Sequence, residues 1–284
     1  MQQIYPAAGR QLGDPGQGRP AGLAALDTLA GLYPYPEAGE QAARPWVRAN
    51  MVTSADGAAT VDGRSGGLSG HADQTVFSVL RSLADVILVG AGTARIEQYR
   101  PVQLAETWPS LRAGRPPTPP IAVVTRQMTG LDPEGPLLAA GSGPARTIVL
   151  TTETAPADLR ARAARTAEVV VAGPDLVRPD AIISALAERG LRRVLTEGGP
   201  RLLEQIVAAG LLDDLCLTVS PVLADGWAGR IVAAPPAGGT RARHPGPPAG
   251  LGPAAQLGPA GLRLAHVLED SGHLLCRYLR TEPN

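Results

Sequence analysis

Lysine is absent from this chain of 284 residues, and all 26 of its basic residues are arginines. This absence excludes a Schiff-base lysine, a phosphate-loop lysine and an ammonium general acid from any chemistry of the chain. The acidic residues also number 26, so the formal net charge is zero and no overall field would gather nucleic acid or an anionic membrane. The sequence therefore favours a small-molecule partner and predicts neither nucleic acid nor a membrane as a partner.

Cysteine and long apolar runs are also scarce. Cys216 and Cys276 lie far apart in two short apolar runs, which is typical of buried thiols in a reducing compartment. The four histidines form no closely spaced ligand set with them, so the sequence predicts no metal site. No apolar stretch is long enough to cross a bilayer, and the first residues lack the pattern of a signal peptide. We expect a cytoplasmic protein.

Two regions differ in composition from the rest of the chain. Residues 1–42 are rich in Gly, Pro and Gln, and predict a partly irregular N-terminal extension with one helix near 23–32. Residues 43–282 predict the folded domain. That domain is interrupted at about 234–260 by a stretch so rich in Pro, Gly and Ala that we expect a loop there.

Short β-branched runs alternate with helical patterns from residue 44 onward, which indicates βα units and a mainly parallel sheet. The expected strands are 47–53, 86–89, 121–125, 147–150, 168–171 and 193–196, and the expected helices are 73–83, 180–189 and 201–209. The last expected strands have no convincing helices between them and are 215–219, 262–268 and 274–279. The predicted fold class is therefore α/β, with a mostly parallel central sheet that finishes in antiparallel strands.

Two glycine-rich turns follow predicted strands. Gly90 and Gly92 follow the strand at 86–89, and Thr93 adds a hydroxyl group, so backbone amides there can approach a diphosphate. Taken alone, such a pair of glycines is more often an ordinary tight turn. The run Glu197-Gly198-Gly199-Pro200 is a stronger signal, because Pro suits a first helical turn whose free amides attract anions. Its carboxyl group lies where open sheets place ligands, or else caps the helix.

A third segment, 50–57, is a strand that ends in the turn Asp56-Gly57 and leads into a loop containing Ser65 and Ser69. Asp-Gly is usually no more than a turn. A long loop of small residues after a first strand can instead be a mobile flap over a site. The residues leave both alternatives open.

Further segments complete a recognisable order, namely Leu80-Arg81, Ala84-Asp85, Gly210-Leu211-Leu212-Asp213-Asp214 and Ser220-Pro221-Val222-Leu223. With them, the chain resembles the reductase domain of riboflavin biosynthesis over residues 44–281. The resemblance implies a dihydrofolate-reductase-like three-layer fold with helices on both faces of the sheet. It also implies NADPH as cofactor and hydride transfer to the ribose carbon of a phosphoribosylamino-pyrimidine, as in a 5-amino-6-(5-phosphoribosylamino)uracil reductase.

The resemblance further implies a homodimer, with the strands at 215–219 and 274–279 as the candidate interface. The zinc deaminase domain that often precedes this reductase is not expected, because its His-x-Glu and Pro-Cys-x-x-Cys elements are missing.

The resemblance also assigns residues to a site. The predicted substrate-binding residues are Asn50, Ser65, Ser69, Arg81 and Arg100. The predicted cofactor-binding residues are Val52, Gly90, Gly92, Thr93, Glu97, Thr125, Arg126, Gly198, Gly199, Pro200, Arg201 and Leu202. Glu197 is the predicted catalytic residue, which supplies a proton or stabilises a developing charge, and Asp56 is the second candidate. Thr125 and Arg126 are expected to hold the ribose 2′-phosphate, so that NADPH is preferred over NADH.

Two positions depart from the family pattern. Asn50 stands where the family commonly has Lys, and Gly67 stands near a common Trp, so an ammonium group and a stacking surface are both lost. These departures leave the exact substrate open. A dihydrofolate or pterin reductase of the same fold is one alternative, and a non-catalytic NADP-binding protein is another.

Overall fold

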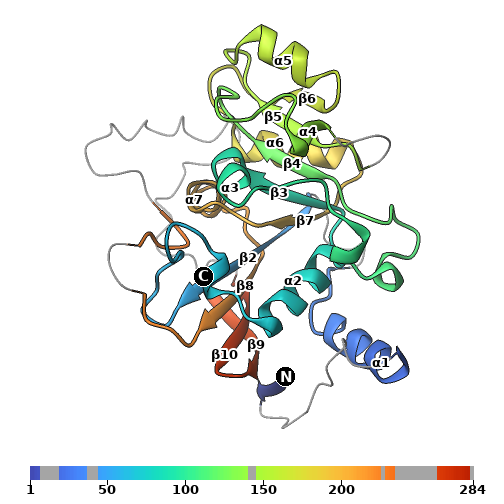
Figure 1. Ribbon diagram of the computed structural model, residues 1–284, viewed down its shortest axis with the longest axis vertical. Coiled ribbons are helices and arrows are strands. Elements are labelled where there is room, and N and C mark those ends of the chain that lie inside the picture. Colours follow the sequence, from blue (N-terminus) through green and yellow to red (C-terminus); the bar gives the residue numbers. More distant parts are fainter. Residues whose placement is uncertain (7–18, 37–43, 140–144, 225–227, 234–260, 282–284) are drawn as a thin grey trace.

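The computed structural model describes residues 1–6, 19–36, 44–139, 145–224, 228–233 and 261–281 (Figure 1). Its strands are β1 (Gln2–Tyr5), β2 (Trp46–Ser54), β3 (Val86–Gly90), β4 (Ile121–Val124), β5 (Ile148–Thr151), β6 (Glu168–Val171), β7 (Arg193–Thr196), β8 (Asp214–Ser220), β9 (Leu262–Asp270) and β10 (His273–Arg280). Its α-helices are α1 (Arg19–Ala30), α2 (His71–Leu83), α3 (Ala91–Ile96), α4 (Pro136–Ala139), α5 (Ala157–Ala163), α6 (Pro179–Glu188) and α7 (Pro200–Ala208). Short 3-10 turns lie at Gly66–Leu68, Leu104–Glu106 and Pro109–Arg112.

All ten strands form one sheet in the order β1-β9-β10-β8-β2-β7-β3-β4-β5-β6. The pairs from β8 through β6 are parallel, and β10 with β8, β9 with β10 and β1 with β9 are antiparallel. The predicted fold class is therefore confirmed, and the switch to antiparallel pairing comes at β8 and β10, where no described helix separates the last strands. Right-handed βαβ crossovers need a helix between parallel strands, and a tight connection permits only antiparallel neighbours.

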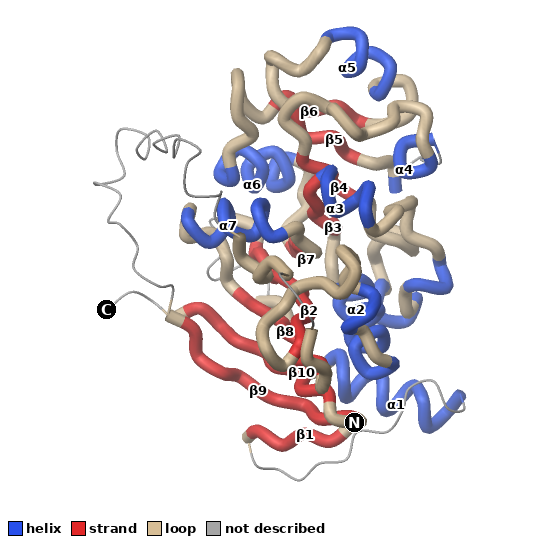
Figure 2. The backbone as a smooth tube through the Cα atoms, turned by 60° about the vertical axis from the view of Figure 1, so that its left-hand side comes forward, coloured by secondary structure: helices blue, strands red, loops and turns tan. Residues whose placement is uncertain are grey.

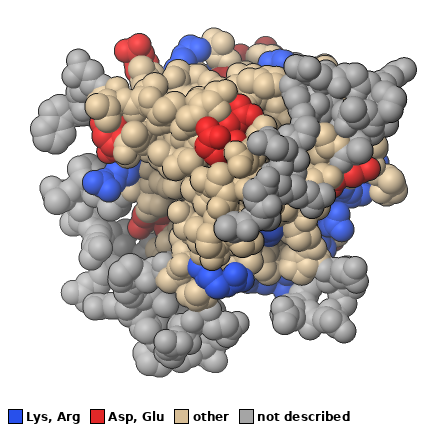
Figure 3. All heavy atoms as spheres, turned by 90° about the horizontal axis from the view of Figure 1, so that it is seen from below, with Lys and Arg blue, Asp and Glu red and all other residues tan. Residues whose placement is uncertain are grey.

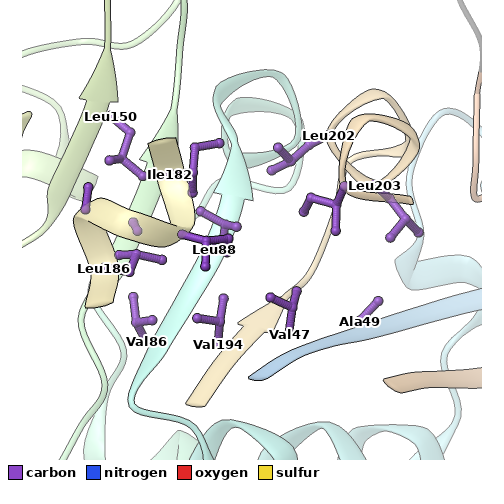
Figure 4. Close-up of a cluster of buried hydrophobic side chains, with 14 of the residues drawn as sticks. Val47, Ala49, Val86, Leu88, Leu150, Ile182, Leu186, Val194, Leu202 and Leu203 are labelled. Carbon is purple, nitrogen blue, oxygen red and sulfur yellow. The ribbon is translucent and has the colours of Figure 1, made fainter. Parts of the chain in front are cut away.

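Helices cover both faces of the parallel part of the sheet, which makes three layers (Figures 1 and 2). On one face, Ile182 and Leu186 of α6 and Leu202 and Leu203 of α7 pack on strand residues such as Leu88 (Figure 4). On the other face, α1 and α2 form a second buried cluster and α3, α4 and α5 form a third. Central strands buried on both faces explain why 86–89 reads as an uninterrupted apolar run.

The first residues join this folded unit, whereas the sequence predicts a partly irregular extension. β1 pairs with the edge of β9, and the described part of α1 buries Leu26 and Leu29 against α2 and the sheet. The expected helix is present because apolar side chains recur at helical spacing, and Tyr33, which follows the helix, is 1% exposed. The predicted division at residue 43 stays a prediction, and the predicted loop at 234–260 lies outside the described residues.

A buried ion cluster attaches the segment after α1 to the sheet. Asp214 of β8 accepts hydrogen bonds from Arg48 of β2 and Arg277 of β10, and all three side chains are at most 7% exposed. The two guanidinium groups also donate to the backbone carbonyls of Leu32, Tyr33 and Pro34. These donations satisfy the buried charges and fix the entry into β2.

The rest of the surface agrees with the balanced composition. Figure 3 shows acidic and basic side chains both present on the face that it presents. None of the helices that the structure describes is both long enough and apolar enough to cross a membrane. Cys216 and Cys276 are buried free thiols on β8 and β10.

Candidate active site

Two glycine turns meet at the carboxyl ends of the neighbouring strands β3 and β7. The Gly90 N–H donates to the carbonyl of Gly198 at 2.8 Å. A Cβ atom at Gly199 would overlap Oγ1 of Thr93, and Gly198 has a φ of +90°, so side chains are not tolerated at this contact. The close approach of the two turns explains why glycines stand at these positions. Gly198 and Gly199 are buried in this contact, whereas the nearby Gly92 is exposed at the carboxyl edge of the sheet, where ligands bind in open α/β folds.

A pocket of about 360 Å³ opens beside these turns. Nine of the predicted site residues line it, namely Asn50, Val52, Ser65, Ser69, Arg81, Thr93, Glu97, Arg100 and Glu197. They come from β2, the loop after it, α2, α3, the segment that follows α3 and the end of β7, so distant parts of the chain converge on one cavity. The sequence prediction therefore brings together residues that are up to about 150 positions apart because parallel strands end at a common edge.

Helix α2 presents one polar face to the pocket. Asp73, Phe77 and Arg81 are spaced four residues apart, which places them in line on the helix, and all three line the cavity. The guanidinium carbon of Arg81 lies 4.2 Å from the centre of the Phe77 ring. An acidic residue in the first turn and Arg81 in the last turn also suit the helix dipole.

Glu197 is the most constrained acidic residue of the pocket. Its Oε1 accepts from Nε of Arg81 at 2.8 Å, and its Oε2 accepts from Nη2 of Arg81 at 2.9 Å and from the Tyr99 hydroxyl at 2.5 Å. The Glu197 side chain is 2% exposed and that of Arg81 is 9% exposed. The arrangement is a forked, charge-assisted ion pair with a third donor, and it holds the carboxylate in one orientation.

Burial and neighbouring charge act on both donors to Glu197. Burial on its own lowers the pKa of Arg81, but the charge and hydrogen bonds of Glu197 outweigh it and hold that pKa above its ordinary value. Burial, followed by the charge of Glu197, raises the pKa of Tyr99 well above 10. The Tyr99 hydroxyl therefore stays protonated and donates a hydrogen bond to the Glu197 carboxylate.

The loop after β2 is attached to the pocket at two serines. The backbone N–H and the hydroxyl of Ser65 both donate to Oε1 of Glu97, at 2.9 and 3.0 Å. The hydroxyl of Ser69 donates to Asp73 at 2.5 Å. Glu97, which the sequence assigns to the cofactor, thus also holds the loop over the cavity.

Other predicted residues lie away from the pocket lining. Asp56 is exposed and accepts from the Ser54 hydroxyl at 2.5 Å and from the Ala224 N–H at 3.1 Å. The Ser54 hydrogen bond is the main reason that the pKa of Asp56 is lowered. These contacts fix the Asp-Gly turn, and they give no contact through which Asp56 would reach the cavity. Its predicted catalytic role remains without structural support.

The remaining cofactor positions surround the glycine turns. Gly92 is exposed and has open space around its Cα, whereas the side chain of Leu202 is buried in the core behind Gly90. Pro200 and Arg201 open α7. Thr125 directly follows β4, and its hydroxyl accepts a hydrogen bond from the Met128 N–H at 3.0 Å; Arg126 beside it is exposed.

Sequence reasoning missed several lining residues, namely Asp73, Gln74, Phe77, Gln98, Tyr99 and Glu106. Tyr99 matters most among them because it contacts Glu197 directly. The sequence feature that could have revealed Tyr99 is the polar run Gln98-Tyr99-Arg100, which directly follows α3. Polar residues of a loop at the carboxyl ends of the strands are candidates for a binding site. Within the part of the chain that the structure describes, no cluster of His, Cys, Asp and Glu could hold a metal ion.

An open α/β sheet with paired glycine turns and a polar pocket at its carboxyl edge defines a domain that binds a small molecule. A family model described as the RibD C-terminal domain matches residues 45–237, and the chain belongs to this family.

Relatives and solved structures agree with that membership. The chain is 28% identical over 185 residues to the 2,5-diamino-6-ribosylamino-4(3H)-pyrimidinone 5′-phosphate reductase of Archaeoglobus fulgidus, covering 64% of this chain and 83% of the relative. It is 28% identical over 184 residues to the protein of the same name in Methanothermobacter thermautotrophicus, covering 64% and 81%. A pyrimidine reductase-like protein from Corynebacterium diphtheriae has the same fold, with a TM-score of 0.70 at 23% identity over 84% of this chain and 93% of that one.

Proposed function

We propose that this protein reduces a ribosylamino-pyrimidine 5′-phosphate with a hydride from NADPH. The observation that carries the proposal is that Ser65, Arg81, Glu197 and Thr93 line one shared pocket beside the paired glycine turns. Two curated relatives carry the name of such a reductase. Their names favour this function over a dihydrofolate or pterin reductase and over a non-catalytic NADP-binding protein.

The residues at the sheet edge fit the cofactor. Gly92 is exposed and has no neighbour that would meet a side chain, the buried Gly198-Gly199 turn packs against the Thr93 side chain, and the exposed Arg126 lies just after β4. Glycine backbone admits a diphosphate closely, and arginine suits a phosphate monoester. NADPH bound there would supply the hydride, and the protein would orient the two reactants.

In the proposed reaction the hydride adds to the ribose C1 while the bond from C1 to the ring oxygen breaks. The released oxygen takes a proton, and the ribose becomes a ribityl chain. We assign Glu197 to orientation and charge stabilisation, because three donors already point at its oxygens. With about four lone-pair positions per carboxylate, Glu197 keeps one position for a hydroxyl or amino group of the substrate.

Two pyrimidine compounds are candidate substrates for this reaction. The two candidate substrates differ in one substituent of the pyrimidine ring. This substituent is an amino group in the compound after which the two relatives are named, and an oxo group in 5-amino-6-(5-phosphoribosylamino)uracil. The test is NADPH oxidation, followed by absorbance, with each of these two compounds and with dihydrofolate under identical conditions. We expect turnover with at least one pyrimidine and none with dihydrofolate. Turnover of dihydrofolate alone, or of no compound, would overturn the proposal.

We also propose a homodimer in the cytoplasm. Both edges of β8 and β10 are paired within the sheet, so a dimer through these strands would use their faces, where Val219 lies opposite the 36%-exposed Leu274. The buried free thiols Cys216 and Cys276 support a reducing compartment. Sedimentation equilibrium at micromolar concentration tests the dimer, and a monomer would refute it.

A further inference from the structure

Both arginines that line the pocket are already paired with carboxylates. Arg81 pairs with Glu197, and Nη2 of Arg100 lies 3.4 Å from Oε1 of Glu106. Glu106 also lies 3.9 Å from Arg81, so these four charges form one connected group. Asp73 lines the same pocket, but no arginine of the described chain lies within ion-pair distance of its carboxylate. The pocket therefore offers a carboxylate at Asp73 that no arginine neutralises.

The Asp73 carboxylate is buried and has acceptor positions to spare. Asp73 is 7% exposed, and its carboxylate accepts a hydrogen bond from the Ser69 hydroxyl at 2.5 Å. An ionised carboxylate has about four acceptor positions, so this contact leaves most of them to a ligand. Burying a charge is costly unless donors surround it. A substrate group that brings N–H donors would therefore gain at this position, whereas one that brings only acceptors would be repelled.

Helix α2 sets Asp73 apart from the arginines. Asp73 stands in the first turn of α2 and Arg81 in the last, which separates them by about 12 Å along the helix axis. Phe77 lies between them on the same face of the helix, and the guanidinium carbon of Arg81 lies 4.2 Å from the centre of its ring. The substrate of the proposed function is polarised in the same way, with a phosphate dianion at one end, the amino-substituted pyrimidine ring at the other and the reacting ribose carbon between them. Charge complementarity therefore directs the phosphate toward Arg100 and the ring toward Asp73.

The two candidate substrates differ at the edge of the ring that a carboxylate would contact. In the diamino compound after which the two relatives are named, the 2-amino group and the neighbouring N3–H are adjacent donors. A carboxylate can accept such a pair in two parallel hydrogen bonds. In the uracil compound an oxo group replaces the 2-amino group, and its lone pairs would face the carboxylate. A polar mismatch of this kind is strongly selective in a buried site, because polar groups of the site are left unpaired.

We propose that Asp73 binds the 2-amino and N3–H edge of the pyrimidine ring and thereby selects the diamino compound over the uracil compound. This inference rests on the proposed function and narrows it to one of the two candidate substrates. It adds a residue of α2 that the sequence pattern does not assign to the site.

The experiment measures kcat/KM for both pyrimidine compounds with saturating NADPH. The variants are Asp73→Asn, Ser69→Ala and, as matched control, Glu106→Gln, which changes another acidic residue of the same pocket. The wild type should prefer the diamino compound about 10- to 100-fold, the range of a hydrogen bond to a charged group. Asp73→Asn should lower kcat/KM for the diamino compound by about that factor, and should not lower it for the uracil compound, since the new amide N–H can donate to the oxo group. Glu106→Gln should change both values by the same factor, and Ser69→Ala, which leaves the carboxylate in place, should keep the wild-type preference.

The outcomes separate this inference from the proposed function. If the wild type reduces a pyrimidine but prefers the uracil compound, or does not discriminate, the inference is wrong and the function stands. If Asp73→Asn lowers both values equally, or if Ser69→Ala removes the preference as fully, Asp73 only holds the loop and the inference is wrong. If the wild type reduces neither compound, the proposed function itself fails. The preference of the wild type is measured without any variant, and equal melting temperatures of the variants exclude unfolding as the cause of a loss.

Discussion

Replacing Glu197 by Gln is expected to cost stability as well as turnover. The change removes the negative charge from an ion pair whose side chains are 2% and 9% exposed and leaves the Arg81 cation buried without its partner. The amide keeps one acceptor oxygen, but Arg81 donates to both oxygens of the carboxylate, so one of these two hydrogen bonds is lost to the NH₂ group. Removing one partner of a buried ion pair costs about 3–5 kcal/mol, and the ring of Phe77 against Arg81 favours the lower end.

A loss of about 3 kcal/mol corresponds to a fall in melting temperature of roughly 6–10 °C for a chain of this size. The assay is urea unfolding and calorimetry of Glu197→Gln beside Asp180→Asn. Asp180 forms a similar forked pair with Arg178, but that pair is 52% and 37% exposed, so its loss should cost less than about 1 kcal/mol. If the two variants are equally stable, the Glu197 pair does not hold a buried charge and the reasoning is refuted.

Three further predictions concern two residues of the pocket and the buried histidine of β9. Tyr99→Phe removes one of three donors to Glu197 and should lower kcat about tenfold with unchanged NADPH affinity; steady-state kinetics that match the wild type would contradict it. Arg100→Ala should raise the KM of the phosphorylated substrate about tenfold, because Arg100 lines the pocket with its side chain 58% exposed and only a 3.4 Å contact to an acidic residue, and an unchanged KM would remove it from the site. Burial, followed by the charge of Arg277, lowers the pKa of His266 to about 4. The stability that the neutral His266 contributes to the fold is therefore fully present above the unfolded-state pKa of about 6.5 and is lost as the pH falls toward 4. The unfolding free energy should therefore drop by about 2 kcal/mol between pH 7 and 5, and His266→Phe, which keeps the ring against Tyr33, should abolish that part of the drop.

The parallel part of the fold is predictable from sequence because its strands are short apolar runs with clear ends. The predicted strand at 168–171 and the predicted strand at 193–196 have the bounds that the structure gives to β6 and β7. Burial makes the central β7 an apolar run, whereas the edge strand β6 is partly exposed and is marked by its three consecutive β-branched residues. The shorter elements α3, α4 and α5 were not predicted, since four to seven residues carry too little periodicity to reveal a helix.

The site was predictable in position and only partly in its contacts. Glycines at strand ends mark the sheet edge, and nine predicted residues do line one pocket. The partners of Glu197 could not be predicted, because Arg81 and Tyr99 are 116 and 98 residues away from it in the chain. The sequence around a glutamate at a strand end is the same whether its carboxylate is free to contact substrate or is paired with an arginine. Only the packing of α2 against the sheet shows that Glu197 is paired.

Transfer of deuterium from NADPH to the product tests the proposed function most directly. The protein is incubated with NADPH that carries deuterium on the reactive face of the nicotinamide ring and with the 2,5-diamino ribosylamino-pyrimidine 5′-phosphate, and the product is analysed by mass spectrometry. The account predicts a ribityl product with one deuterium on the carbon that was C1 of the ribose. Oxidation of NADPH without deuterium in the product, or recovery of the pyrimidine unchanged, would contradict it.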